Sequence, residues 1–122
     1  MIKGKVSPDG IPFIDVRIKD QTLNAIIDTG FNGDLELPES LHEKLNHRFV
    51  GSIVSMLAAG QRIEEYVYLV DFPFDDKIVQ AEVTFVPDTQ ILIGTHLLQN
   101  YLLKIDFVNT DIQLSRQEEI IS

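Results

Sequence analysis

The sequence predicts an all-β protein that contains one or two short helices. Apolar and polar residues alternate with a period of two along most of the chain, as expected for strands with one buried face. Turn-forming residues interrupt this alternation at fairly regular intervals, for example at Ser7-Pro8-Asp9-Gly10. Only two short stretches have the features of a helix. These observations favour a sheet protein over any helical class.

Each expected strand ends at a turn signal. The hairpin that begins at residue 48 turns near Gly60, and the next connection runs through residues 73–76. In chain order, the predicted strands are residues 2–6, 12–18, 23–27, the two arms of a hairpin from 48 to 72, 78–86, 91–93, 102–107 and 112–114.

Two segments are predicted to be helical. Pro38 stands before residues 39–45, where its missing N–H costs nothing, and Leu41 and Leu45 share one face. Thr95 can cap a second helix of under two turns that reaches Tyr101.

Length and composition indicate one globular domain over residues 1–122. Hydrophobic residues make up 44% of the chain. The formal net charge of −9 argues against nucleic-acid binding. The absence of cysteine excludes disulfides, thiol nucleophiles, cysteine zinc sites and iron–sulfur clusters. No apolar run has the length of a membrane span and no signal peptide is visible, so we expect a soluble, cytoplasmic protein that binds no membrane.

Asp28-Thr29-Gly30 directly follows the apolar strand 23–27. A carboxylate there is costly to desolvate unless a partner satisfies it or a reaction uses it. A threonine hydroxyl can bond locally, and a glycine lets another backbone approach closely. An aspartic peptidase needs this combination. On the tripeptide alone, a turn with an aspartate cap after a strand is the favoured explanation.

Further features in a fixed order make the pattern more specific. Residues 91–98 repeat an apolar strand that ends at a glycine and leads into a helix, and residues 103–107 follow as a strand. With the hairpin at Gly60, the order and spacing resemble a retropepsin-like aspartic protease over roughly residues 10–115. The chain looks most similar to the single-domain microbial group whose active-site loop reads Asp-Thr-Gly-Phe, here residues 28–33.

This resemblance implies a retropepsin-like closed barrel that forms a two-fold symmetric homodimer. Each subunit supplies Asp28, and the pair of carboxylates activates water to hydrolyse a peptide bond. By the same resemblance, Thr29 and Gly30 complete the catalytic loop. No metal, cofactor or covalent intermediate is required. The implied partners are a second copy of the chain and a peptide or protein substrate.

The resemblance also implies further site residues. Phe31 and Asn32 would bind substrate beside the catalytic loop. The hairpin over residues 56–63, with Ala58, Ala59 and Gly60 at its tip, would close as a flap over a peptide held as an extended strand.

Two other segments are implied to support the loop and the dimer. Ile93 and Gly94 would lie beneath the catalytic loop. The apolar Ile120-Ile121 in a polar tail makes residues 115–122 a possible interface strand, together with the N-terminal strand.

One part of the family pattern is missing. Retroviral proteases have an aspartate shortly after Asp-Thr-Gly that pairs with an arginine after the later glycine. Here the corresponding positions hold Phe31, Asn32 and Thr95. Both charges are absent together, which is coherent, because losing one would leave the other unpaired.

The other polar motifs have structural explanations. His42 and His47 are five residues apart, about 140° around a helix, whereas a zinc-binding helix needs a spacing of four. A solvated helix face is the better interpretation. His96 is interpreted as a surface or cap-adjacent histidine on the short second helix, and the alternative is a position beneath the loop at Asp28. Asp75-Asp76 is interpreted as a turn and Asp106 as a structural residue in a strand.

Two alternatives to the peptidase remain open. The same fold can serve as a dimerisation or peptide-binding module with little or no activity, although such a module has no physical need for an intact Asp28-Thr29-Gly30. A small β-barrel binding protein with an accidental motif is the third interpretation, and it predicts a monomer.

Overall fold

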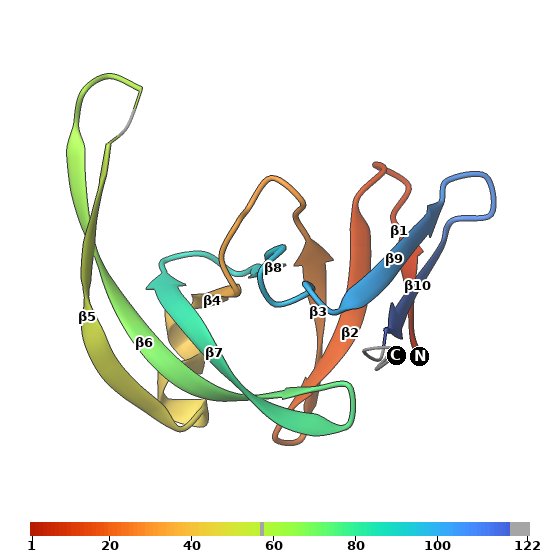
Figure 1. Cartoon of the computed structure of the whole chain (residues 1–122), viewed down its shortest axis with the longest axis horizontal. Helices are drawn as coiled ribbons and strands as arrows, with labels where there is room; N and C mark the ends of the chain where they lie inside the picture. Colours follow the sequence, from red (N-terminus) through yellow and green to blue (C-terminus); the bar gives the residue numbers. More distant parts are fainter. Residues whose placement is uncertain (57, 118–122) are drawn as a thin grey trace, which may run out of the picture.

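The computed structural model describes residues 1–56 and 58–117, whose ten strands form a single sheet (Figure 1). The sheet order is β5-β6-β7-β4-β8-β3-β2-β1-β10-β9. The all-β prediction is therefore confirmed. The elements are β1 Ile2–Val6, β2 Pro12–Ile18, β3 Gln21–Ile27, β4 Leu35–Pro38, η1 Glu39–Lys44, β5 His47–Met56, β6 Arg62–Phe74, β7 Lys77–Val86, β8 Ile91–Ile93, β9 Tyr101–Asp106 and β10 Asp111–Arg116.

Tight turns set the register of the β2–β3 and β6–β7 hairpins. Lys19 between β2 and β3 has a φ of 53°. Asp75 and Asp76 between β6 and β7 have φ values of 56° and 58°. Two consecutive residues with positive φ match the right-handed twist of the flanking strands, so the turn continues β6 into β7 without splaying them.

The middle of the sheet joins segments that are distant in sequence. β3 pairs in parallel with β8 through Ile27 and Ile93, and β4 pairs in parallel with β7. β4 and β8 are antiparallel, with Leu35 opposite Ile93. These pairings place β8, which comes much later in the chain, between the end of β3, where Asp28 follows, and β4, which begins after the loop.

The two faces of the central strands have different environments. One face is apolar and buried, and it forms the core together with buried residues of β1, β2, β6 and β10. Its central members are Ala25, Ile27, Leu35, Leu37, Val83, Ile91 and Ile93. The opposite face carries a row of half-buried residues that the registers place side by side: Phe13, Ile26, Leu92, Glu36, Thr84 and Val67.

The predicted closed barrel is wrong. Among the described residues, β5 and β9 each pair with one strand only and form the two ends of an open sheet. The reason is geometric, since the β5–β6 hairpin rises away from the body of the protein, on the opposite side from β9 (Figure 1).

The helical predictions hold only in part. The first segment is a 3₁₀ helix, Glu39–Lys44, with Leu41 buried. The expected second helix is a series of turns with i→i+3 hydrogen bonds, including Leu98 N–H to the Thr95 carbonyl at 3.2 Å and Tyr101 N–H to the Leu98 carbonyl at 2.9 Å. The chain enters β9 at Tyr101, so no length remains for an α-helix. No helix within residues 1–56 and 58–117 is long and apolar enough to cross a membrane.

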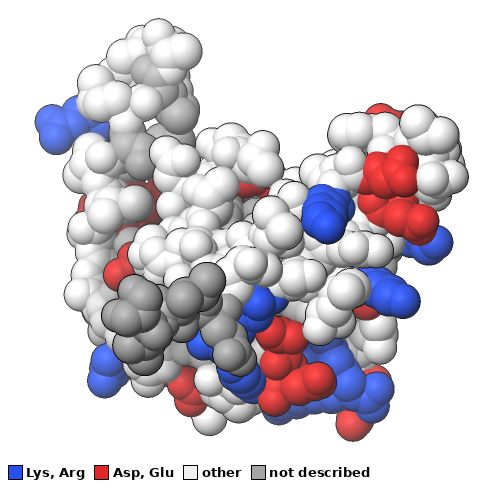
Figure 2. Space-filling model, turned by 45° about the vertical axis from the view of Figure 1, so that its right-hand side comes forward, with Lys and Arg blue, Asp and Glu red and all other residues white. Residues whose placement is uncertain are grey.

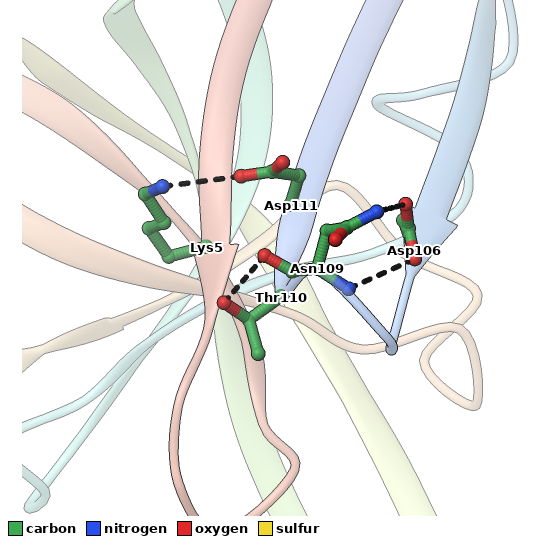
Figure 3. Close-up of polar contacts among 5 residues, drawn as sticks. All are labelled: Lys5, Asp106, Asn109, Thr110 and Asp111. Carbon is green, nitrogen blue, oxygen red and sulfur yellow. Dashed lines mark hydrogen bonds and ion pairs between the residues drawn. The ribbon is translucent and has the colours of Figure 1, made fainter.

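The β9–β10 turn is fastened by Asp106 (Figure 3). Its carboxylate accepts hydrogen bonds from the Asn109 side chain at 2.8 Å and from the backbone N–H groups of Val108 and Asn109. The Asn109 side chain is the main reason that the pKa of Asp106 lies below its ordinary value. Beside the turn, Lys5 bonds Asp111 at 3.1 Å. These contacts give Asp106 a structural role.

Only the first part of the predicted tail, residues 115–117, lies within the described residues. Ser115 and Arg116 continue β10, and the Gln117 N–H donates to the Asn100 carbonyl at 2.8 Å. Residues 118–122, including Ile120 and Ile121, lie outside the described residues.

Candidate active site

The loop of residues 28–34 is the centre of the candidate site. The Asp28 N–H donates to the Ile93 carbonyl at 2.9 Å, which fixes the start of the loop to β8. The Asp28 carboxylate accepts a hydrogen bond from the Gly30 N–H at 3.0 Å. The backbone carbonyl of Asp28 accepts one from the Phe31 N–H at 3.1 Å. Asp28 is half-buried, and its own loop orients its carboxylate.

The segment after β8 lies against the whole loop. The N–H groups of Gly94, Thr95 and His96 donate to the carbonyls of Asp34, Phe31 and Gly33 at 2.9, 2.8 and 3.2 Å. A Cβ atom on Gly94 would collide with the Gly33 carbonyl and the Phe31 ring, so the close approach requires glycine there. The structure therefore places Ile93 and Gly94 in direct contact with the loop.

A side-chain contact reinforces this backbone pairing. Asp34 is buried, and its Oδ1 lies 2.5 Å from His96 Nδ1. Its Oδ2 accepts the Glu82 N–H at 2.9 Å. The hydrogen bond to Asp34 raises the pKa of His96 above its ordinary value. The sequence interpretation placed His96 at the surface, where most of the ring indeed lies, but missed this partner.

The tip of the loop is open to solvent. Thr29, Gly30 and Asn32 are exposed, whereas Phe31 is half-buried. The loop lies at the same end of the molecule as the tip of the β5–β6 hairpin (Figure 1). Figure 2 shows a hollow between two projections at this end, and charged side chains gather on the right-hand projection and lower on the molecule.

The hairpin places the predicted flap residues at its end. Ala58, Ala59 and Gly60 are exposed, and Gly60 has a φ of 78° that favours glycine. Large apolar side chains along both arms are also exposed to solvent: Phe49, Val50, Ile53, Val54, Met56, Ile63 and Tyr66.

A cavity of about 620 Å³ begins beside β3, two residues before Asp28. Its walls include Phe13 and Ile26 from the half-buried row and Thr89 and Gln90 from the loop before β8. The cavity does not include Asp28 itself. It is large enough for a side chain of a bound peptide.

Glu36 makes the same half-buried row acidic. Burial is the main cause that raises the pKa of Glu36, and the negative charges of Glu65, Asp88 and Asp28 raise it further. The charged groups are brought together by β4, β6 and the loops that follow β7 and β3. Positive charge nearby would be stabilised by this field.

The remaining candidates lie away from the loop. The rings of His42 and His47 are 3.8 Å apart and pack edge-on against Tyr68 and Phe85. The interpretation of a solvated helix face is thus wrong for His42, which is half-buried in this aromatic cluster. No group of three potential metal ligands occurs in the part of the chain that the structure describes.

Asp75 belongs to the β6–β7 turn, as the sequence predicted. Its carboxylate accepts the Tyr101 hydroxyl at 2.8 Å and so links this turn to β9. Burial, followed by this hydrogen bond, raises the pKa of Tyr101 to about 12. The pair has a structural role at the other end of the molecule.

Comparisons with known proteins identify the fold. No protein-family model and no curated protein matches the chain. Among solved structures, the protease of simian foamy virus (mac) is 24% identical with a TM-score of 0.57, over 71% of this chain and 91% of that one. A retropepsin-like aspartic protease from Rickettsia conorii is 18% identical with a TM-score of 0.62, over 93% of this chain and 88% of that one.

A third structure agrees with these two. A foamy viral protease-reverse transcriptase, solved in complex with an RNA/DNA hybrid, is 22% identical with a TM-score of 0.51, over 77% of this chain and 13% of that longer one. At these sequence identities the likeness shows a common architecture. The chain has the retropepsin-like fold, in agreement with the resemblance seen in the sequence.

Proposed function

We propose that this protein is an aspartic endopeptidase that is active as a homodimer. The observation that carries the proposal is the placement of Asp28. Its carboxylate is oriented by the Gly30 N–H on a loop fastened to β8, and the adjoining residues Thr29 and Gly30 remain exposed. The position of this loop on a retropepsin-like fold, at the same end as the tip of the β5–β6 hairpin, favours an active site over a turn with an aspartate cap.

A single chain supplies only half of the required chemistry. Asp28 is the one aspartate followed by Thr-Gly in the sequence. An isologous contact around a two-fold axis brings two copies of the same loop together. Thr29 would then donate a hydrogen bond to the opposite loop and hold the two loops in register. β1, β10 and β9 are the strands that we expect to adjoin this interface, since within residues 1–56 and 58–117 no strand pairs with the outer edge of β9.

Two Asp28 carboxylates in contact do not both ionise easily, so the pair holds one proton. The ionised member takes a proton from a bound water, which attacks the scissile carbonyl. The protonated member donates to the carbonyl oxygen as the tetrahedral intermediate forms. The carboxyl group that took the proton from water then gives it to the leaving amine, while a hydroxyl of the tetrahedral intermediate returns a proton to the other carboxylate. The C–N bond breaks without a covalent enzyme intermediate, and the dyad again holds one proton.

The substrate would lie as an extended strand between the loop and the hairpin. Gly30 would exchange main-chain hydrogen bonds with the peptide, while Phe31 and Asn32 would contact its side chains. The tip formed by Ala58, Ala59 and Gly60 would close over it. The cavity beside Ile26 would accept one substrate side chain.

The test combines cleavage with mass measurement. The full chain is incubated with a degenerate peptide library, products are read by mass spectrometry, and the assembly is measured by sedimentation equilibrium. Asp28→Asn should lower cleavage by at least about 1,000-fold, because the general base and acid are lost together, while the dimer mass is unchanged.

Asp76→Asn is the matched control, since it makes the same chemical change in an exposed turn and should leave cleavage intact. A dimer that cleaves no library peptide would favour the alternative of a dimerisation or peptide-binding module. A strict monomer at tens of micromolar would contradict the proposed site.

A further inference from the structure

The contact between Asp34 and His96 joins the two segments that shape the loop. Asp34 closes the loop of residues 28–34, and His96 lies on the segment that follows β8. One carboxylate oxygen of Asp34 meets His96 Nδ1 at 2.5 Å, and the other accepts the Glu82 N–H from β7 at 2.9 Å. The buried carboxylate therefore links β4, β7 and the post-β8 segment at one point.

His96 differs from Asp34 in its access to water. About 62% of its side chain is exposed, against 9% for Asp34. A proton can thus enter or leave the ring without opening the core. A charge-assisted bond between imidazolium and carboxylate is roughly twice as strong as a neutral one. A neutral ring carries one proton, and only the Nδ1 tautomer can donate it to Asp34.

We propose that Asp34 and His96 form a pH-sensitive bracket that holds the loop of residues 28–34 against the segment after β8 while His96 is protonated and loosens it when His96 becomes neutral. His96 is then a positioning residue, and its effect on catalysis rests on the proposed peptidase function. The effect on the loop itself does not rest on that function.

The charged groups facing His96 agree in sign. Asp34 contacts the ring from the loop and Glu82 faces it from β7, and both negative charges favour the protonated ring. The pKa of His96 is accordingly raised. Below the ordinary value of 6.5 the stabilisation is complete, and it is lost as pH rises through the higher value of the folded protein. Loosening is therefore expected above pH 6.5, as the ring loses its proton in the folded protein.

The loop backbone provides the direct readout. Three amides bridge the segments that the bracket joins, namely Gly94 to Asp34, Thr95 to Phe31 and His96 to Gly33. Their hydrogen-exchange protection factors, corrected for the intrinsic pH dependence of exchange, are measured by NMR between pH 5.5 and 9. The His96 ring proton signals give its titration in the same samples. Protection should fall severalfold as His96 loses its proton.

Two variants distinguish the effect of the charges on Asp34 and His96 from the effect of the hydrogen bond between them. In His96→Asn, the amide nitrogen replaces Nδ1 as a donor that does not titrate, so protection of the three amides should become independent of pH. In Asp34→Asn, the amide keeps an oxygen for the Glu82 N–H but removes the charge, so His96 should titrate at lower pH. His47→Asn is the control, because His47 bonds the Leu45 carbonyl away from the loop.

The proposal is overturned if wild-type protection does not change while His96 titrates, or if His96→Asn keeps the pH dependence of the wild type. For the peptidase, kcat of the wild type should decline with deprotonation of His96 with little change in KM, and His96→Asn should remove that part of the decline. Absence of cleavage in every variant would refute the proposed function, while the exchange data would still decide on the bracket.

Discussion

At Asp28, backbone hydrogen bonds hold both the carboxylate and the start of the loop. The Gly30 N–H orients it, and the Ile93 carbonyl anchors its own N–H. The neighbouring half-buried row adds negative charge through Glu36. Glu36 has no positive partner among the causes that shift its pKa, all of which raise it. Its ionised form is therefore less favourable in the folded protein than in the unfolded chain.

Replacement of this charge should stabilise the protein in a pH-dependent way. Because the folded-state pKa of Glu36 is raised, its carboxylate destabilises the fold at neutral pH, and this penalty disappears as pH falls below the ordinary value of 4.5. Glu36→Gln should raise the melting temperature by about 1 to 3 °C at pH 7 and not at pH 4, as thermal unfolding followed by circular dichroism can show.

Glu64→Gln provides the comparison, since Glu64 lies exposed on β6 and the same chemical change there should have little effect. An equal gain at both pH values for Glu36→Gln would contradict the electrostatic explanation.

The sequence predicts residues 28–33 as a candidate catalytic loop but does not show which contacts hold this loop in place. Asp28-Thr29-Gly30 after an apolar strand is a local pattern, and the second apolar strand before Gly94 indicated the supporting segment. Asp34 and His96 form a contact between residues 62 positions apart, so no local periodicity reveals it. The one signal available was an aspartate immediately before the buried Leu35.

Among the elements, hairpins were predicted well because their turn residues and alternation are close in sequence. β4 was not predicted as a strand, because only four residues form it and its partners β7 and β8 are distant in the chain. The prediction of the second helix was wrong for a related reason. Thr95 can start a helix, but the chain pairs with β10 as strand β9 from Tyr101 onward.

The β6–β7 turn allows a test at this scale. Asp76 has a φ of 58°, a region that glycine occupies without the steric cost paid by residues with a Cβ. Asp76→Gly should stabilise the protein by about 0.5 to 1 kcal/mol in urea denaturation. Asp75 is left unchanged because it bonds Tyr101.

Asp20→Gly is the opposing control. It lies in the exposed β2–β3 turn without a positive φ, so glycine there only increases the freedom of the unfolded chain and should destabilise. Destabilisation by Asp76→Gly would mean that the side chain of Asp76 makes a contribution larger than its backbone strain.

For the whole molecule, the open sheet and the charge matter most. In the part of the chain that the structure describes, the sheet ends at β5 and β9 instead of closing. Local sequence patterns could not show this, because closure depends on how far the hairpin bends from the body. Each subunit carries a formal charge of −9. Two such subunits repel one another in the proposed homodimer, and the repulsion is screened by salt.

Dimerisation should therefore strengthen with ionic strength. Raising sodium chloride from about 20 mM to about 300 mM should lower the dimer Kd severalfold, since the Debye length falls well below the size of a subunit. Sedimentation equilibrium at several protein concentrations measures this. A Kd that rises with salt would indicate an interface held by opposite charges, which the proposed contact around Asp28 does not predict.

The central claim is that one active site needs Asp28 from two subunits. The most direct measurement mixes wild-type and Asp28→Asn subunits at constant total concentration, above the dimer Kd, and follows cleavage after exchange is complete. With half of the subunits replaced, about a quarter of the activity should remain, because only dimers with two wild-type subunits hold both carboxylates. If half of the activity remains, each subunit acts alone and the account is wrong.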